Sequence, residues 1–184
     1  IFLYPEHRNI GMVFQSYAIW PHLSLEKNVS YPLDIRKVNQ SEIDDRVTAT
    51  LRLVGLEDMM GKEATQLSGG QQQRAALARA IVFHPKLLLF DEPLSNLDLK
   101  LRERMRVELK RIQHEVGITS VYVTHDQAEA LVMSDRVVVM NKGVIQQIDD
   151  PETIYSRPAN AFVASFIGGA NLLEGKILSR EGNV

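Results

Sequence analysis

The sequence predicts an α/β domain built on a parallel β-sheet that helices cover. The apolar run LLLF at residues 87–90 is typical of a strand buried on both faces of such a sheet. Residues 119–124, TSVYVT, alternate in polarity and are rich in β-branched side chains, so they predict the next parallel strand. Between the two strands lies a helical stripe of Leu101, Met105, Leu109, Ile112 and Val116, which ends at Gly117.

Composition places the chain among ordinary globular proteins. Its 184 residues are 45% hydrophobic and 24% charged, enough for one domain with a sizeable core and a short tail. A net charge of −2 gives no electrostatic case for binding nucleic acid or an anionic membrane. The absence of cysteine excludes disulfides and thiolate metal sites. No apolar run reaches eighteen residues, so no transmembrane helix is predicted and any membrane contact must come through a partner.

The first third of the chain predicts a strand and a helix. Residues 10–14, IGMVF, form a short apolar strand that ends at Gln15. Ser41, followed by Asp44, resembles a helix N-cap with an acidic first turn. The expected helix has a buried stripe of Ile43, Val47, Leu51 and Val54.

A glycine-rich segment precedes the next predicted helix, at residues 71–83. Ser68 is a good N-cap, and Gly69 and Gly70 allow backbone N–H groups to approach an anion closely. The start of this helix is therefore a candidate phosphate site. A simple glycine turn that caps the helix is the alternative, and both readings stay open from these residues alone.

Two carboxylates follow directly after the apolar strand. Ligands of parallel sheets bind beyond the carboxyl ends of the strands, which is where Asp91 and Glu92 fall. Adjacent charges there are costly unless they serve a purpose, and one could handle Mg²⁺ while the other activates water. An acidic turn after a strand is the plain alternative. His125 follows the strand at residues 119–124 and is expected at the same edge of the sheet as Glu92.

The last part of the chain predicts a hairpin and short helices. A turn at residues 141–143, NKG, joins two short strands, and Asp150 with Pro151 starts a helix. The expected helices and strands cover residues 127–133 (helix), 137–140 and 144–148 (strands) and 159–167 (helix).

Taken together, these segments resemble the ATP-hydrolysing subunit of ABC transporters. The family's signature matches LSGGQ, which contains Ser68, Gly69, Gly70 and Gln71. Its Walker B strand matches LLLFDE at residues 87–92, and its D-loop matches SNLD, which ends at Asp98. The Q-loop glutamine matches Gln15 in GMVFQ, and the switch histidine matches His125 in VYVTHD. The five motifs appear in the family's order, and the resemblance covers nearly the whole chain.

The resemblance implies a P-loop NTPase (RecA-like) core with an inserted α-helical signature subdomain. Residues 1–24 would carry the Q-loop part of the core and residues 25–84 the helical subdomain. Residues 85–168 would return to the core with Walker B, the D-loop and the switch histidine. Residues 169–184 resemble the opening strand of the accessory β-barrel domain of importers.

One motif of the family does not match. A P-loop ATPase needs G-x-x-x-x-G-K-[ST], and the nearest segment, GLEDMMGKE at residues 55–63, has one spacer too many and ends in Glu63. We expect this segment to be a loop between helices. In the family, the Walker A loop precedes the Q-loop, so it is expected before Ile1, in a longer parent protein.

The resemblance also implies the role of each candidate residue. Glu92 would orient or deprotonate water, Asp91 and Gln15 would hold Mg²⁺, and Gln15 and His125 would complete the γ-phosphate site of ATP. The signature group Ser68, Gly69, Gly70 and Gln71 would serve the nucleotide of a second ATPase subunit. A head-to-tail homodimer follows, with Asp98 at its seam.

The importer subfamily of maltose, polyamine and ferric-iron type is the expected group. It implies integral membrane permease subunits, an indirect solute-binding protein, no nucleic acid and a place at the cytoplasmic face of a bacterial membrane. Tyr17 and Trp20 could belong to the core or to the permease groove. Two alternatives remain: a non-transport ABC ATPase acting on DNA or ribosomes, although no coiled coil, zinc module or basic arm is present, or a fragment with no ATP binding of its own.

Overall fold

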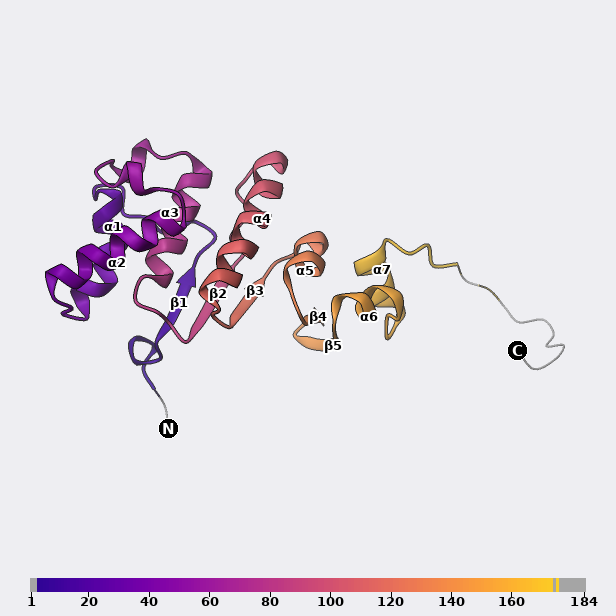
Figure 1. Cartoon of the computed structure of the whole chain (residues 1–184). Helices are drawn as coiled ribbons and strands as arrows, with labels where there is room; N and C mark the ends of the chain where they lie inside the picture. The colour runs from indigo at the N-terminus through magenta and orange to yellow at the C-terminus, as the bar shows by residue number, and fades with distance from the viewer. Residues whose placement is uncertain (1–2, 174, 176–184) are drawn as a thin grey trace. The chain divides into compact units, whose positions relative to one another are not determined.

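The structure is a computed structural model that describes residues 3–173 and 175 (Figure 1). The chain divides into two compact units, residues 1–125 and residues 126–184. The boundaries predicted from the resemblance stay a prediction.

A three-stranded parallel sheet forms the centre of the first unit. Its strands are β1 (Ile10–Val13), β2 (Leu87–Asp91) and β3 (Ser120–Val123), in the order β1-β2-β3. The predicted α/β class is confirmed. Because both pairs are parallel, with Val13 opposite Phe90 and Phe90 opposite Tyr122, all three strands end at the same edge.

Burial of the central strand differs from the prediction. Leu88 and Phe90 are buried, but Leu89 on the opposite face is only half-buried. Val121 and Val123, which share that face, are 50% and 52% exposed. The prediction of burial on both faces was therefore wrong for the described residues, because burial depends on covering elements and not on the strand's own sequence.

Three helices, α1 (Leu25–Ile35), α2 (Gln40–Leu53) and α3 (Gly69–Ile81), form a layer of the first unit (Figure 1). The predicted stripe of α2 is buried as expected. Its predicted N-cap was wrong by two residues: Asn39, not Ser41, caps the helix, and its Oδ1 accepts from the Glu42 N–H at 2.9 Å.

Helix α3 lies very close to β1. A Cβ at Gly11 would come within 2.4 Å of the Ala80 carbonyl, so only glycine permits this approach. Helix α4 (Leu99–Val116) connects β2 to β3 and ends at Gly117, whose φ of 65° is the left-handed cap predicted. Three residues of its predicted stripe are fully buried, namely Met105, Leu109 and Ile112.

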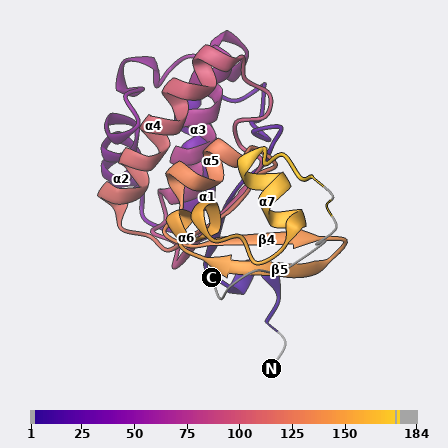
Figure 2. The same ribbon diagram turned by 90° about the vertical axis from the view of Figure 1, so that its right-hand side faces the viewer.

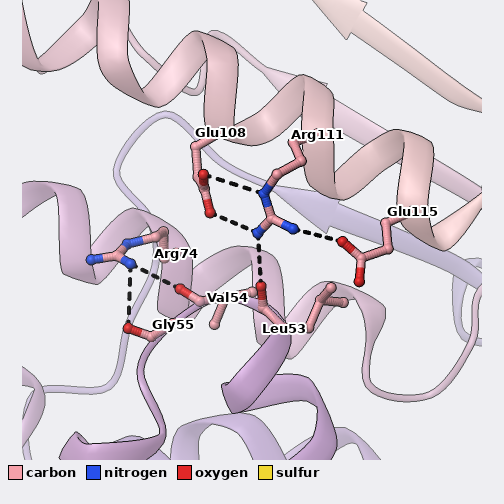
Figure 3. Close-up of polar contacts among 7 residues, drawn as sticks. All are labelled: Leu53, Val54, Gly55, Arg74, Glu108, Arg111 and Glu115. Atoms are coloured by element: carbon pink, nitrogen blue, oxygen red, sulfur yellow. Dashed lines mark hydrogen bonds and ion pairs between the residues drawn. The ribbon is translucent and has the colours of Figure 1, made fainter.

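Two arginines hold the C-terminal end of α2 (Figure 3). Arg74 of α3 donates to the carbonyls of Val54 at 2.9 Å and Gly55 at 3.3 Å. Arg111 of α4 donates to the Leu53 carbonyl at 3.0 Å. Helix C-termini leave carbonyls without partners, and cations there also complement the helix dipole. These contacts tie α2 to both neighbouring helices.

The segment at residues 55–63 is a connection between α2 and α3, as predicted. It contains the short 3-10 helix η2 (Glu57–Met59). The carbonyls of Lys62 and Met60 accept from the N–H groups of Leu25 and Glu26, at 2.8 and 3.1 Å. A phosphate cradle presents N–H groups, whereas this loop turns carbonyls toward the start of α1.

The part of the second unit that the structure describes contains an antiparallel hairpin and three short helices (Figure 2). Lys142 and Gly143, at φ 48° and 78°, form the hairpin turn. Its elements are α5 (Gln127–Met133), β4 (Val137–Asn141), β5 (Val144–Asp149), α6 (Pro151–Ser156) and α7 (Ala161–Gly168). Its core is made of Val137, Val139, Ile154, Val163 and Ile167.

Two further 3-10 helices are η1 (Pro5–His7) and η3 (Ala64–Gln66). The strand predicted in residues 171–184 lies largely outside the described residues. The described residues of that segment, 171–173 and 175, have no regular secondary structure. None of the helices in the described ranges combines the length and apolar character needed to cross a membrane.

Candidate functional site

The carboxyl edge of the parallel sheet gathers four of the predicted site residues, namely Gln15, Asp91, Glu92 and His125. The register places Val13, Phe90 and Tyr122 side by side. Gln15 follows Val13 by two residues, Glu92 follows Phe90 by two, and His125 follows Tyr122 by three. This convergence follows from parallel strand pairing, as the sequence predicts.

Glu92 and His125 are in direct contact. The Nδ1 atom of His125 lies 3.1 Å from Oε2 of Glu92, with the two side chains 69% and 31% exposed. The predicted placement of the two at one edge is confirmed, whereas their chemical roles stay predictions. A carboxylate that contacts an imidazole and is open to solvent can orient a bound water or accept a proton from it.

The backbone at Glu92 is strained. Its φ of 44° lies in the left-handed region, which is uncommon for a residue with a Cβ. Hydrogen bonds hold it there: its N–H donates to the Val123 carbonyl at 3.0 Å, and its carbonyl accepts from the Ser95 hydroxyl at 2.9 Å. The turn after β2 therefore fixes the direction in which Glu92 leaves the sheet.

Asp91 and Gln15 present exposed side chains at the same edge. Asp91 is the last residue of β2 and pairs with Val123. The described residues contain no group of three or more His, Cys, Asp or Glu side chains that could hold a metal by themselves.

A contact that the sequence did not predict joins Gln15 to the turn after β2. The Nδ2 atom of Asn96 donates to the Gln15 carbonyl at 2.8 Å, across 81 residues of sequence. Asn96 lies inside the SNLD segment, which was the available signal. The loop that carries Gln15 and the turn that carries Glu92 are thus physically connected.

Asp98 caps helix α4. Its Oδ1 accepts from the Leu101 N–H at 3.0 Å, and Arg102 donates to the neighbouring Leu97 carbonyl at 3.0 Å. The residues before α4 are therefore fixed on their own chain. The predicted place of Asp98 at a subunit seam stays a prediction.

The predicted anion site lies at the start of α3. Ser68 is the N-cap, and its N–H donates to Oε1 of Gln71 at 2.8 Å. Ser68 and Gly69 are exposed, but Gly70 is buried. A Cβ at Gly70 would lie 3.1 Å from Cδ1 of Leu101, closer than most contacts of real Cβ atoms, so α3 packs tightly against α4 at this glycine.

The two groups of candidate residues are separate within one chain. Among the described residues, no hydrogen bond or ion pair links the Ser68–Gln71 group with Glu92 or His125.

Tyr17 and Trp20 differ in burial. Tyr17 is 8% exposed and belongs to the core, where burial raises the pKa of its phenol. Trp20 is half-buried, with its ring 4.5 Å from that of Tyr31 and 4.6 Å from Cζ of Arg79. Sequence reasoning missed Arg79, although a charged residue within the apolar run of α3 was a visible signal.

Comparison with known proteins identifies the family of this chain. A family model described as ABC transporter matches residues 4–95. A trehalose/maltose import ATP-binding protein, MalK, of Thermococcus litoralis is 55% identical over 168 residues, 91% of this chain and 45% of that protein. A spermidine/putrescine import ATP-binding protein, PotA, of Acetivibrio thermocellus is 57% identical over 180 residues, 98% of this chain and 51% of that protein.

A second PotA, of Thermobifida fusca, is 58% identical over 171 residues and 93% of this chain. The chain spans about half the length of the curated relatives it matches. The family model covers half of the chain, and the matches to the relatives extend over nearly all of it. The chain belongs to the ABC transporter family.

Proposed function

We propose that the protein containing this chain is the ATP-binding and ATP-hydrolysing subunit of an ABC importer. The observation that carries the proposal is the contact of Glu92 with His125 at the sheet edge, beside the exposed Asp91. Glu92 orients the attacking water or accepts its proton. His125 contacts the carboxylate through Nδ1, and its Nε2 can donate to a phosphate oxygen when that nitrogen also carries a proton.

The residues at this edge fit Mg-ATP. Magnesium takes oxygen ligands and is commonly bound by one or two carboxylates together with substrate phosphates, so a single exposed carboxylate suits it. Asp91 would hold the ion directly or through water, and the amide oxygen of Gln15 would supply a further ligand. The bound ion would neutralise charge that develops on the γ-phosphate. Such catalysis depends on positioning, which the strained turn at Glu92 supports.

Two subunits would share each nucleotide site. The exposed start of α3 lacks any bond to Glu92 or His125 among the described residues, which supports its use by a second subunit. The N–H groups of Gly69 and Gly70 and the hydroxyl of Ser68 suit phosphate oxygens at a helix N-terminus. A head-to-tail homodimer results, with Asp98 near its seam.

The remaining partners follow from the relatives. MalK and PotA are named as import subunits, which supports membrane permease subunits and a solute-binding protein as partners and the cytoplasmic face of the membrane as the location. The names divide between sugar and polyamine import, so identity does not choose the solute. Trp20 and Tyr31, an aromatic pair with Tyr31 42% exposed, suit the permease contact.

The decisive experiment follows nucleotide-driven dimerisation. This sequence has no G-x-x-x-x-G-K-[ST] segment, so the test uses a full-length protein that contains the chain. With Glu92→Gln to prevent hydrolysis, Mg-ATP should convert monomer to dimer in size-exclusion chromatography. Adding Ser68→Arg should abolish the dimer, because bulk and charge enter the shared phosphate site.

Ser41→Arg is the matched control, since Ser41 is also an exposed serine in the first turn of a helix. Dimers should form normally with this variant. Dimerisation that survives Ser68→Arg, or that never depends on Mg-ATP, would contradict the shared site.

A further inference from the structure

Arg79 is a buried cation whose described partners all lie in one loop. It is 8% exposed, and burial lowers the pKa of its guanidinium, although arginine stays charged at neutral pH. Its two nitrogens Nη1 and Nη2 donate to the carbonyls of Ala18 at 2.6 Å and Tyr17 at 2.8 Å. Its Cζ lies 4.6 Å from the Trp20 ring centroid. A buried charge needs such partners, and here backbone carbonyls and an aromatic face supply them.

The two residues that Arg79 holds are both strained. Tyr17 has a φ of 61° and Ala18 a φ of 47°, so two consecutive residues with a Cβ occupy the left-handed region. This conformation persists only where the surroundings over-determine it. The paired hydrogen bonds from Arg79 are the contacts that fix these two peptide groups.

The strained pair follows Gln15 in the sequence, with Ser16 between them. The Tyr17 N–H donates to the Phe14 carbonyl at 3.0 Å, which closes a turn around Gln15. On the far side, the fully buried Asn28 binds the Trp20 N–H at 2.9 Å and the Trp20 carbonyl at 3.0 Å. Gln15 thus lies between the end of β1 and a segment that α1 and α3 hold in place.

We propose that Arg79 is a positioning residue that keeps Gln15 at the carboxyl edge of the sheet by holding Tyr17 and Ala18 in their strained conformation. The inference deepens the proposed function and rests on it. It gives Arg79, in the last turn of α3, the task of placing Gln15 at the nucleotide site. Arg79 does not touch the substrate, and it acts through the backbone of the Gln15 loop.

Arg74, on the same helix, provides a matched control. It also donates to two consecutive carbonyls, those of Val54 and Gly55. The left-handed residue there is a glycine, at φ 64°, which adopts this conformation without strain. Arg74 is therefore also an arginine that binds two backbone carbonyls, through Nη1 alone, but it holds no strained residue in the Gln15 loop.

The experiment compares Arg79→Lys with Arg74→Lys in the full-length protein. Lysine keeps the charge but loses the fork that reaches two carbonyls. Arg79→Lys should lower kcat for ATP hydrolysis about tenfold at nearly constant KM, because a small misplacement near the reacting atoms lowers the rate. Amide hydrogen exchange in residues 16–20 should accelerate about tenfold, as the local opening becomes easier. Arg74→Lys should change neither quantity.

Ala18→Gly supplies a rescue that a merely structural role would not give. Glycine adopts the left-handed conformation without steric cost, so the loop needs the arginine less. In the Arg79→Lys protein, Ala18→Gly should restore most of the lost kcat. In the Arg74→Lys protein it should leave kcat unchanged.

Ala18→Val tests the same strain without touching Arg79, should Arg79→Lys fail to fold. Ala18 is exposed, and a β-branched residue is poorly tolerated at positive φ. A lower kcat with faster exchange in residues 16–20 is expected, and unchanged values would overturn the inference. If the wild-type protein hydrolyses no ATP, the proposed function fails, and the exchange data alone then decide whether Arg79 fixes the loop. If it does hydrolyse ATP while Arg79→Lys matches Arg74→Lys throughout, only the inference about Arg79 fails.

Discussion

The carboxyl edge of the sheet and the C-terminal end of α2 are both polar, but they differ in how their groups are satisfied. At the end of α2, Arg111 binds Glu108 at 2.8 Å, Glu115 at 2.6 Å and the Leu53 carbonyl at 3.0 Å (Figure 3). At the sheet edge, Glu92 has a strained backbone, and the ion-pair contact of its carboxylate among the described residues is with the largely exposed His125.

This difference separates stability from function. Groups that satisfy one another locally stabilise a fold and offer little to a ligand. Residues with a strained backbone and a side chain open to solvent are typical of binding and catalytic sites. Substitutions at the two places should therefore affect different measurements.

The largest effect is expected from Glu92→Gln in the full-length protein. The amide keeps the size of the side chain but cannot accept a proton from water, so steady ATP hydrolysis should fall by about 10²–10⁴-fold. ATP binding and the unfolding midpoint should stay unchanged. Glu103→Gln, an exposed glutamate of α4, is the control. Undiminished turnover would refute the assignment of Glu92.

His125→Ala should have the second-largest effect. Loss of the group that holds Glu92 and faces the phosphate should lower turnover by about 10²-fold, measured as phosphate release. Because the His125 side chain is 69% exposed, stability should change by less than about 0.5 kcal/mol. His114→Ala, an exposed histidine on α4, should leave turnover intact. Equal rates for the two variants would place His125 outside the site.

Arg111→Met should reverse the pattern. Methionine fills similar space but donates nothing to Leu53 or to the two glutamates, so the free energy of unfolding should fall by about 1 kcal/mol. ATP turnover at low temperature should be unaffected. Arg104→Met, on an exposed part of the same helix, controls for the loss of charge. A loss of turnover without a loss of stability would break the distinction between the two regions.

The smallest effect is expected from Glu108→Gln, and it should depend on pH. The hydrogen bond from Arg111 holds the pKa of the Glu108 carboxyl below its ordinary value of 4.5. The pair therefore stabilises the fold above about pH 4.5, and this stabilisation is lost as the pH falls through the lowered pKa. Because the side chain is about a third exposed, the difference from wild type at neutral pH should be about 0.5 kcal/mol. A difference that grows on acidification would contradict the sign of this linkage.

Local sequence patterns predicted most of the elements and the place of the sheet-edge site. The helix at residues 127–133 has the predicted bounds, and the strand before Glu92 extends one residue further, to Asp91. Parallel pairing then brings Glu92 and His125 together, because residues that follow neighbouring parallel strands meet at one edge. The α2 cap was missed because Asn39 and Ser41 are both good caps and only the chain path chooses between them.

Apolar runs and short motifs are local features, and they were enough to predict the parallel sheet, the family and the candidate residues. Which face of β2 is covered, and that Arg79 and Asn96 hold the loop around Gln15, became visible only once the chain was folded. These contacts join residues 61 to 81 positions apart. They arise from the packing of α3 against β1 and from the turn after β2, which no local pattern specifies.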